Sequence, residues 1–552
     1  MTGWSSRLVP GPAGAGYRHL TRLPPESRVV RTELADPGEV APGSRTGLLA
    51  FTHLTDLHVL DDRSPARVEY LDRYADPDLP TRREFPHVGT YRPQDPLTTH
   101  VVEAMVQAVN DVDASPVLGR PLDWSIVTGD STDNCQANEL AWYLTLLEGG
   151  QVHPVSGEAG GEASGGVGRS GPDWFDERYW HPEGSPPGAD DDRPHRLCGF
   201  PRVPGLWQQV ARPFEASGLT RPWYAVYGNH DAMLQGTVPA TPATAALVTA
   251  GHKPVAAASQ VQALAALRAL REEGPASLDV LLSGPGRPVP ADPHRRFVSK
   301  SEWVGAHFGP RSRPHGHGLA GAAPGEAAYA FDAGPVRALV LDTVNPHGGW
   351  HGSLDRGQLE WLAAELRAGS STVLDDSGRA TRAGGRSDRL FVVFSHHPLE
   401  TLTNGYAPEG EDRVLGAEVQ QLLLRHPNVV LWVSGHVHRH WVRPLQRPRH
   451  WAVPGGLWQV STASLIDWPQ QSRVVELALN GDGTLSIFTT VLDHAAPLVG
   501  QPSSPDPLAL AALSRSLSAN AWQRDVTAED TGLAGGQGDR NTELLLRAPD
   551  WT

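Results

Sequence analysis

The sequence predicts a mixed α/β fold in which two packed β-sheets are flanked by helices. Five short apolar runs are each followed by a polar motif. This pattern is typical of buried strands that are followed by loops at one edge of a sheet. Segments with helical spacing lie between the early runs, whereas strand-like runs cluster towards the C-terminal end. Helices mixed with strands early, and strands clustered late, suit two sheets that carry helices on their outer faces.

The expected elements follow from this periodicity in chain order. Strands that lead into a polar motif are expected over 48–54, 124–127, 223–226, 390–394 and 429–433. Further strand-like runs cover 327–331, 336–341, 457–461, 473–479 and 484–492. Helical patterns cover 96–112, 137–147, 261–273, 354–367, 414–425 and 507–518.

The chain has 552 residues, which exceeds the usual ~100–200 residues of one domain. Because the five motifs must serve one site, we interpret residues 45–495 as a single catalytic domain with insertions. Residues 1–44 are expected to pack irregularly before the first strand, and 496–552 to form a helical tail. Inside the catalytic domain, the Gly-rich stretch 149–171 is expected to be a flexible excursion, and 232–325 is a candidate cap.

Charge and cysteine content exclude several classes of protein. The formal net charge of −15 argues against general binding to nucleic acid backbones, which requires clustered positive charge. Cys135 and Cys198 cannot form a disulfide scaffold, and neither lies in a CxxC pattern. No apolar stretch has the length of a signal peptide or of a membrane-spanning helix. We therefore predict a cytoplasmic protein without membrane partners, and the oligomeric state is left open.

The five motifs carry the chemistry of the chain. They are Asp56-Leu57-His58, Gly129-Asp130-Ser131-Thr132-Asp133-Asn134, Gly228-Asn229-His230-Asp231, Ser395-His396-His397-Pro398 and Gly435-His436-Val437-His438. Their carboxylate, amide and imidazole groups are ligands for metal ions, and no thiolate is among them. This ligand chemistry favours Mn²⁺, Fe²⁺/Fe³⁺, Zn²⁺ or a mixture over a closed structural zinc site.

The order and wording of these motifs resemble the calcineurin-like metallophosphoesterase superfamily, which includes purple acid phosphatases, phosphoprotein phosphatases and cyclic-nucleotide phosphodiesterases. The resemblance covers roughly residues 47–440, with long unmatched insertions. It implies a four-layer sandwich of two β-sheets between helices, and a centre of two metal ions. Such ions, about 3.5–4 Å apart, share a bridging water and lower its pKa.

The resemblance also implies a role for each ligand. Asp56 and His58, two residues apart on what we expect to be an extended strand, would bind the first ion. Asp130 would bridge the two ions. The remaining ligands would be Asn229, His396 and His436 on the second ion and His438 on the first. His397 is an alternative to His396, which we favour because the family's ligand precedes a bulky residue and Pro.

Three further residues are assigned roles by the same resemblance. His230 would donate a proton to the leaving alkoxide, a contribution typically worth 10²–10⁴-fold. Asp133 would orient His230 and favour its protonated form. Asn134 is the candidate substrate-binding residue, because phosphoprotein phosphatases carry a phosphate-clamping Arg directly after that Asp. An Asn cannot make the bidentate clamp, which weakens a phosphoprotein phosphatase interpretation.

Other polar residues have structural interpretations. His53 is expected to be structural, and His315 and His317 to be loop residues despite their metal-like spacing. Six arginines in the first long loop are within reach of a substrate, but solvated charge is the expected role for most of them. They are Arg63, Arg67, Arg73, Arg82, Arg83 and Arg92.

The leading hypothesis is a dinuclear metal-dependent phosphoesterase. It would hydrolyse phosphomonoesters or phosphodiesters of small molecules by attack of a metal-bridging hydroxide. One alternative is a metal-stabilised binding or scaffold module of the same fold with little turnover. A second alternative, a metal-dependent nuclease, is less attractive because the acidic chain shows no basic groove.

Overall fold

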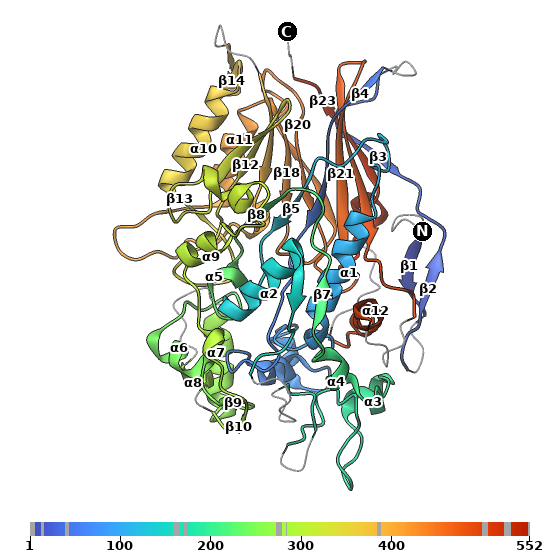
Figure 1. Ribbon diagram of the computed structural model, residues 1–552. Helices are drawn as coiled ribbons and strands as arrows, with labels where there is room; N and C mark the ends of the chain where they lie inside the picture. Colours follow the sequence, from blue (N-terminus) through green and yellow to red (C-terminus); the bar gives the residue numbers. More distant parts are fainter. Residues whose placement is uncertain are drawn as a thin grey trace.

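Two mixed β-sheets lie side by side in the computed structural model of the chain (Figure 1). The structure describes residues 6–12, 16–38, 44–157, 166–170, 174–271, 279–282, 284–382, 388–499, 506–523 and 532–549. The seven-stranded sheet has the order β3 (Val29–Leu34), β23 (Thr542–Arg547), β22 (Thr484–Asp493), β21 (Gln471–Asn480), β4 (Arg45–Leu54), β5 (Trp124–Thr128) and β8 (Trp223–Val226). The six-stranded sheet has the order β11 (Tyr329–Ala333), β12 (Val336–Val340), β16 (Leu390–Phe394), β18 (Val429–Ser434), β20 (Gly456–Ser461) and β19 (Trp441–Gln446).

The two sheets are joined by a common apolar core. Phe51 of β4 stacks on Trp124 of β5 with ring centroids 4.4 Å apart, and its edge meets Phe394 of β16 at 5.6 Å. Tyr224 of β8 stacks on Phe331 of β11 at 3.7 Å. Strands buried on both faces need no polar alternation, which explains why these runs are almost continuously apolar.

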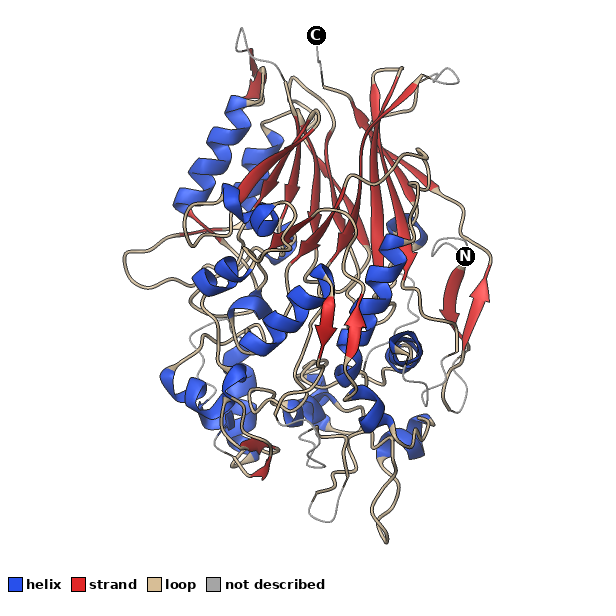
Figure 2. Cartoon of the chain, in the orientation of Figure 1, coloured by secondary structure: helices blue, strands red, loops and turns tan. Residues whose placement is uncertain are grey.

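Helices cover the outer faces of both sheets (Figure 2). On the seven-stranded side lie α1 (Thr98–Asn110), α2 (Ala137–Glu148) and α12 (Pro507–Ser518). On the six-stranded side, α10 (Arg356–Ala368) and α11 (Gly416–Leu424) share one apolar cluster with β16 and β18. The predicted α+β sandwich of two mixed sheets flanked by helices is therefore confirmed.

The remaining elements belong to connections and insertions. The helices are α3 (Arg193–Cys198), α4 (Leu206–Val210), α5 (Asn229–Ala232), α6 (Pro242–Val248), α7 (Gln260–Arg271), α8 (Asp279–Leu282) and α9 (Lys300–Ala306). Two-stranded pairs are formed by β1 (Arg7–Pro10) with β2 (Leu20–Leu23), β6 (Gly150–Val152) with β7 (Phe214–Ala216), β9 (His252–Pro254) with β10 (Gly286–Pro288), β13 (Leu354–Asp355) with β17 (Arg413–Val414), and β14 (Thr372–Leu374) with β15 (Ala380–Arg382).

Both ends of the chain depart from expectation. Residues 1–44 were expected to be irregular, but β3 pairs in parallel with β23 at the edge of the main sheet. Residues 496–552 were expected to be a helical tail, and they contribute α12 but also β23. Strand β23 lies between β22 and β3, and it is the partner of β3 from the opposite end of the chain, so sequence periodicity cannot reveal the pairing of β3. The division into a catalytic domain and insertions stays a prediction.

The two insertions also contain regular structure. Within 149–171, β6 pairs with β7, which corrects the expectation of a flexible excursion for its first residues. Residues 158–165 and 171 lie outside the described residues. The candidate cap 232–325 contains α6, α7 and α8, which lie below the sheets in Figure 1. Within the described ranges, every helix falls short of the length and apolar character required to cross a membrane.

Candidate metal centre

The five motifs follow strands whose carboxyl ends lie at the same edge of the sandwich. Strands β4, β5 and β8 are parallel neighbours in one sheet, and β16 and β18 are parallel neighbours in the other. Figure 2 shows that loops and helices fill the space below both sheets. Residues directly after the carboxyl ends of parallel strands are therefore brought together from distant parts of the sequence.

The loops after β4 and β5 are joined by backbone hydrogen bonds. Asp56 N–H donates to the Gly129 carbonyl at 3.1 Å, and His58 N–H donates to the Asp130 carbonyl at 2.9 Å. A parallel bridge between Val59 and Thr132 continues the pairing. This pairing fixes the first two motifs relative to each other before any side chain is considered.

The backbone at the candidate ligands has an uncommon conformation. Among the described residues, nine non-glycine residues have positive φ, and five of them are candidate ligands. These five are Asp56, His58, Asp130, His436 and His438, with φ between 44° and 69°. The expectation that Asp56 and His58 project together from an extended strand is thus corrected, because β4 ends at Leu54 and left-handed residues turn both side chains. Such strained residues cluster at functional sites.

One group of ligand atoms comes from Asp56, His58 and His438. These atoms lie within 4.8 Å of one another. The Nε2 atoms of His58 and His438 are 3.2 Å apart, and His438 Nε2 lies 3.4 Å from Asp56 Oδ1. The three side chains predicted for the first ion therefore converge on one point.

Asp130 lies between this group and the remaining candidate ligands. Its Oδ2 is 3.1 Å from His396 Nε2 and 3.8 Å from His58 Nε2. The His396 and His436 rings have centroids 5.1 Å apart. The carboxylate thus faces histidines from both predicted ion sites, as a bridging ligand must.

Two buried ligand atoms have no hydrogen-bond partner. His396 Nε2 makes no hydrogen bond, although Asp130 Oδ2 is close to it. Asn229 Oδ1 is likewise buried and unpaired, while its Nδ2 donates to the Gly236 carbonyl at 2.9 Å and fixes the amide orientation. Other buried side-chain atoms of the described residues are also unpaired, but these two belong to the motifs whose carboxylates and imidazoles converge, so a ligand bound there would complete them. The residues present therefore fit a pair of metal ions.

Three of the candidate histidine ligands are oriented through Nδ1. In His58, His438 and His396, Nδ1 contacts Asp133 Oδ1, Asp467 Oδ2 and the Thr128 carbonyl at 3.0, 2.7 and 2.8 Å, respectively. Such contacts orient the ring of a metal ligand and leave Nε2 available.

Three buried histidines outside the proposed ligand set, His397, His53 and His317, use both ring nitrogens within the protein. His397 Nδ1 contacts Thr343 Oγ1 at 2.8 Å and Nε2 donates to the Trp350 carbonyl at 2.9 Å. His53 is held between two threonine hydroxyls at 2.7 Å, and His317 contacts Glu148 at 2.9 Å. His396 therefore retains an available nitrogen whereas His397 does not, and His53 is structural as expected. His317, expected to be a loop residue, is buried in the short 3₁₀ segment His315–Gly321.

The electrostatics of the site favour cations. Burial alone would raise the pKa of Asp130, but the neighbouring imidazoles of His396 and His230 hold it well below its ordinary value. Burial also opposes protonation of His396, yet Asp130 raises the pKa of that imidazole to about 9. Asp56 and Asp130 together form a buried, negatively charged centre, which requires positive charge beside it.

Arg67, Arg92 and Asp467 hold the ligands in place, a role that the sequence does not predict for them. Arg67 is 1% exposed and pairs with Asp133, Asp95 and Glu69. Arg92 Nε donates to Asp467 Oδ1 at 2.7 Å, behind His438. These two arginines were expected to be solvated or within reach of a substrate. No local pattern links them to the histidines, because the contacts arise only in the folded chain.

His230 is oriented differently from the expectation. Its Nδ1 donates to the backbone carbonyl of Asp133 at 2.8 Å, whereas the Asp133 carboxylate lies 3.7 Å away. That carboxylate instead contacts His58 and Arg67, both of which compete for it. The expected orientation by the carboxylate is therefore corrected to orientation by the carbonyl. The His230 side chain is 20% exposed and lines a pocket of about 450 Å³.

Asn134 is buried beneath the site. Its Nδ2 donates to Asp133 Oδ2 at 2.9 Å, and its Oδ1 accepts from Gln235 Nε2 at 3.0 Å. Both ends of the amide are thus engaged within the protein, which favours a role in positioning Asp133. The direct substrate contact predicted for Asn134 stays a prediction.

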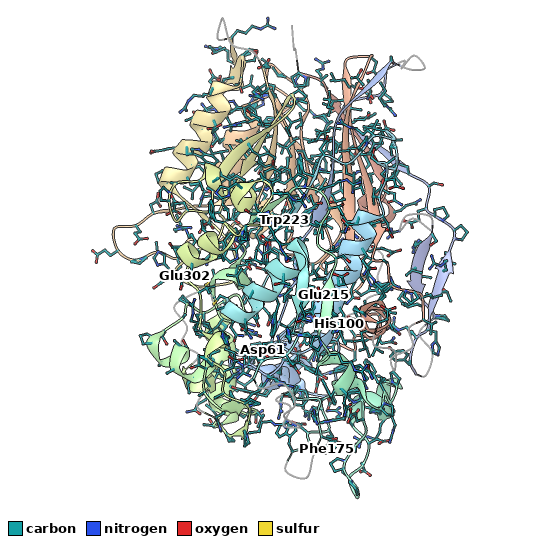
Figure 3. The ribbon with its side chains drawn as sticks, in the orientation of Figure 1. Asp61, His100, Phe175, Glu215, Trp223 and Glu302 are labelled. Carbon is teal, nitrogen blue, oxygen red and sulfur yellow. The ribbon has the colours of Figure 1, made fainter. Side chains whose placement is uncertain are left out.

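The loop beyond His58 is anchored to α2 and to the candidate cap. Asp61, below α2 in Figure 3, accepts from Asn138 Nδ2 at 3.0 Å and from Arg295 Nε at 2.8 Å. Its N–H donates to Glu139 at 3.0 Å. These buried contacts hold the loop that carries His58 against the rest of the molecule.

Comparisons with known proteins give only distant likenesses. No family model matches the sequence, and no curated protein matches it. Among solved structures, a purple acid phosphatase from yellow lupin (Lupinus luteus) seeds aligns over 86% of this chain at 11% identity, with a TM-score of 0.27. The alignment spans 54% of that phosphatase chain, about half of its length.

A second solved structure is GAP50, described as the anchor in the inner membrane complex of Plasmodium. It aligns over 81% of this chain and 85% of its own at 10% identity, with a TM-score of 0.25. At these TM-scores neither likeness carries weight for fold or function. The function of this chain must therefore be inferred from the residues of its site.

Proposed function

We propose that this chain is a metal-dependent phosphoesterase that hydrolyses phosphomonoesters or phosphodiesters of small molecules. The observation that carries the proposal is the pair of buried, unpaired atoms, His396 Nε2 and Asn229 Oδ1, beside converging carboxylates and imidazoles. A pocket of about 450 Å³, which His58, His230 and His438 help to line, is of the size that small-molecule sites have.

The proposed ligands divide into two sets that share Asp130. Asp56, His58 and His438 would hold one ion, and Asn229, His396 and His436 the other. Two such ions, of Mn, Fe or Zn, supply a water with lowered pKa and neutralise charge on the phosphoryl group. The paired carboxylates and the oriented Nε2 atoms preorganise the site for them.

His230 supplies the proton that the departing alkoxide needs. The Asp133 carbonyl accepts from Nδ1–H and so fixes the ring, which leaves Nε2–H of the imidazolium to protonate the ester oxygen. Its partial exposure at the pocket gives access to a bound ester. Expulsion of an alkoxide is costly at neutral pH, so this proton transfer lowers the main barrier.

The proposal is tested with metal-depleted protein reconstituted separately with Mn²⁺, Fe²⁺ and Zn²⁺ and assayed against a panel of phosphomonoesters and phosphodiesters. We expect hydrolysis with two ions bound per chain. Asp130→Ala should lose both metal and turnover, because both ion sites share this carboxylate. His230→Gln should retain both ions while turnover falls by about 10²–10⁴-fold.

Two outcomes would overturn the proposal. Retained activity in Asp130→Ala would remove the assigned centre. Two bound ions without hydrolysis of any ester in the panel would instead favour the alternative of a metal-stabilised binding module.

A further inference from the structure

An apolar pocket adjoins the imidazoles of the candidate centre. His58, His230 and His438 form one end of the 450 Å³ space. Much of the remaining wall is apolar, and its main contributors are Leu71, Phe85, Val88, Leu234, Leu267 and Leu270. A molecule with its phosphoryl group at the imidazoles must therefore place the rest of its structure against hydrocarbon.

The apolar wall is built by two segments that are far apart in the sequence. Leu71 and Phe85 come from the long loop after the first motif, whereas Leu234 and Leu267 belong to the candidate cap. All four belong to one apolar cluster, separate from the core between the sheets. Tyr70 Oη donates to the Leu281 carbonyl at 2.8 Å and ties the two segments together. The pocket is consequently a product of tertiary packing between the two segments.

Polar side chains in the wall are largely committed to protein partners. Glu84 accepts from Arg268 Nε at 2.6 Å, and the Gln235 amide donates to Asn134 at 3.0 Å. Thr90 Oγ1 is buried without a hydrogen-bond partner. Because most of the pocket surface is hydrocarbon, a sugar bound here would lose hydrogen bonds between its hydroxyl groups and water without replacing all of them.

We infer that the substrate is a phosphate ester whose alcohol portion is a compact apolar group, an alkyl chain or an aryl ring, that fills this pocket. The inference rests on the proposed function. Hydrolysis would break the bond between phosphorus and the ester oxygen and form a bond from phosphorus to a water oxygen. The ester oxygen takes a proton from His230, and the attacking water releases one to solvent, from which His230 is reprotonated. The products are an apolar alcohol and a phosphate, or a phosphate monoester when the substrate is a diester.

Esters of increasing chain length test the inference. Metal-loaded protein is assayed with n-alkyl phosphates from ethyl to octyl, with the corresponding methyl alkyl diesters, and with ribose 5-phosphate and glycerol phosphate. The alkyl series keeps the leaving-group chemistry nearly constant while the buried hydrocarbon grows. We expect kcat/KM to rise about 3-fold per added methylene until the pocket is full, and the sugar and glycerol esters to be poor substrates.

Substitutions of residues that line the pocket test whether the pocket causes the dependence of kcat/KM on chain length. Leu264 and Leu270 are both half-buried on α7, but only Leu270 lines the pocket. Leu270→Gln should lower the octyl-to-ethyl ratio of kcat/KM by about 10-fold or more, whereas the matched Leu264→Gln should leave this ratio unchanged. Val88→Phe should fill part of the pocket, so kcat/KM should stop increasing at a shorter alkyl chain of the substrate. Metal content and circular dichroism of each variant establish that it is folded and loaded.

The outcomes distinguish the inference from the function on which it rests. Hydrolysis of none of the esters by metal-loaded protein overturns the proposed function and the inference with it. Hydrolysis that is independent of chain length, or faster with sugar phosphates, overturns the inference and leaves the phosphoesterase proposal intact. A chain-length gain that Leu264→Gln and Leu270→Gln reduce equally would also contradict this pocket as its origin.

Discussion

At the scale of single residues, the convergence of ring nitrogens and carboxylate oxygens distinguishes the candidate ligands. The Nδ1 atoms of His58 and His438 are held by Asp133 and Asp467, and Nε2 of each ring points to the same small region. Carboxylates in this position fix the ring and increase the basicity of the opposite nitrogen. Burial opposes ionisation of Asp133, but the buried Arg67 behind it holds the pKa of this carboxyl below its ordinary value, and Arg92 holds Asp467 in place.

Replacement of Asp467 tests this arrangement. Asp467→Asn removes the negative charge behind His438 with little change in volume, so we expect metal affinity to fall by about 10–100-fold. The measurement is competition with a chelating indicator. As a control, the exposed Asp412, paired with Arg356, can be changed to Asn in the same way. Equal affinities for both variants would show that Asp467 does not support the metal ligand.

At the scale of elements, the site forms because the loops after β4 and β18 approach each other closely. Gly435 follows β18, and a Cβ at this position would lie 1.9 Å from Thr55 Oγ1 and 2.5 Å from Asp56 Oδ2. The glycine therefore lets the fifth motif approach the first. His436 N–H then donates to both Asp56 carboxylate oxygens, at 3.1 and 3.0 Å.

A methyl group at this contact should separate the two motifs. Gly435→Ala must move the β18 loop or the Asp56 side chain, and a displacement of about 1 Å can reduce turnover by about 10²-fold. We expect this loss together with fewer than two bound ions per chain, measured by elemental analysis. Gly305 in α9 has no atom within 4 Å of an added Cβ, so Gly305→Ala is the matched control. Full metal content and activity in Gly435→Ala would contradict the tight contact.

The difference between local patterns and contacts that join distant segments explains how much of the fold and the site could be predicted from the sequence. The strands and the five motifs were predictable because each motif is local and directly follows its apolar run. Arg92 and Asp467 were not, because their pairing joins segments 375 residues apart. Strand β3 was missed for the same reason, since its partner β23 lies at the opposite end of the chain. Left-handed backbone at Asp56 and His58 also leaves no compositional signal in non-glycine residues.

At the scale of the whole molecule, buried neutral histidines link folding to pH. Burial lowers the pKa of His100 on α1 (Figure 3) to about 3, and that of His307 also to about 3. For His426, burial and nearby arginines lower the pKa to about 4. None of these is a candidate metal ligand, so their effect on stability is independent of metal binding.

These histidines should destabilise the fold in acid. Their pKa values are lower in the folded than in the unfolded chain, so the unfolded state binds more protons between pH ~3 and ~6.5. Stability is therefore complete above the unfolded pKa and falls as pH decreases, by up to about 1.4 kcal/mol per pH unit for each histidine. Thermal unfolding of metal-free protein should show Tm decreasing from pH 7 to 4.5. His100→Gln should flatten this dependence, whereas the same change at exposed His153 should not.

The central claim is that seven side chains from five strand ends hold two metal ions around Asp130. Anomalous diffraction from crystals of the metal-loaded protein measures this most directly. We predict two peaks about 3.5–4 Å apart that flank the Asp130 carboxylate, with His396 Nε2 and Asn229 Oδ1 on the same ion. Peaks elsewhere, or ordered metal-loaded crystals with no peak beside Asp130, would contradict the claim.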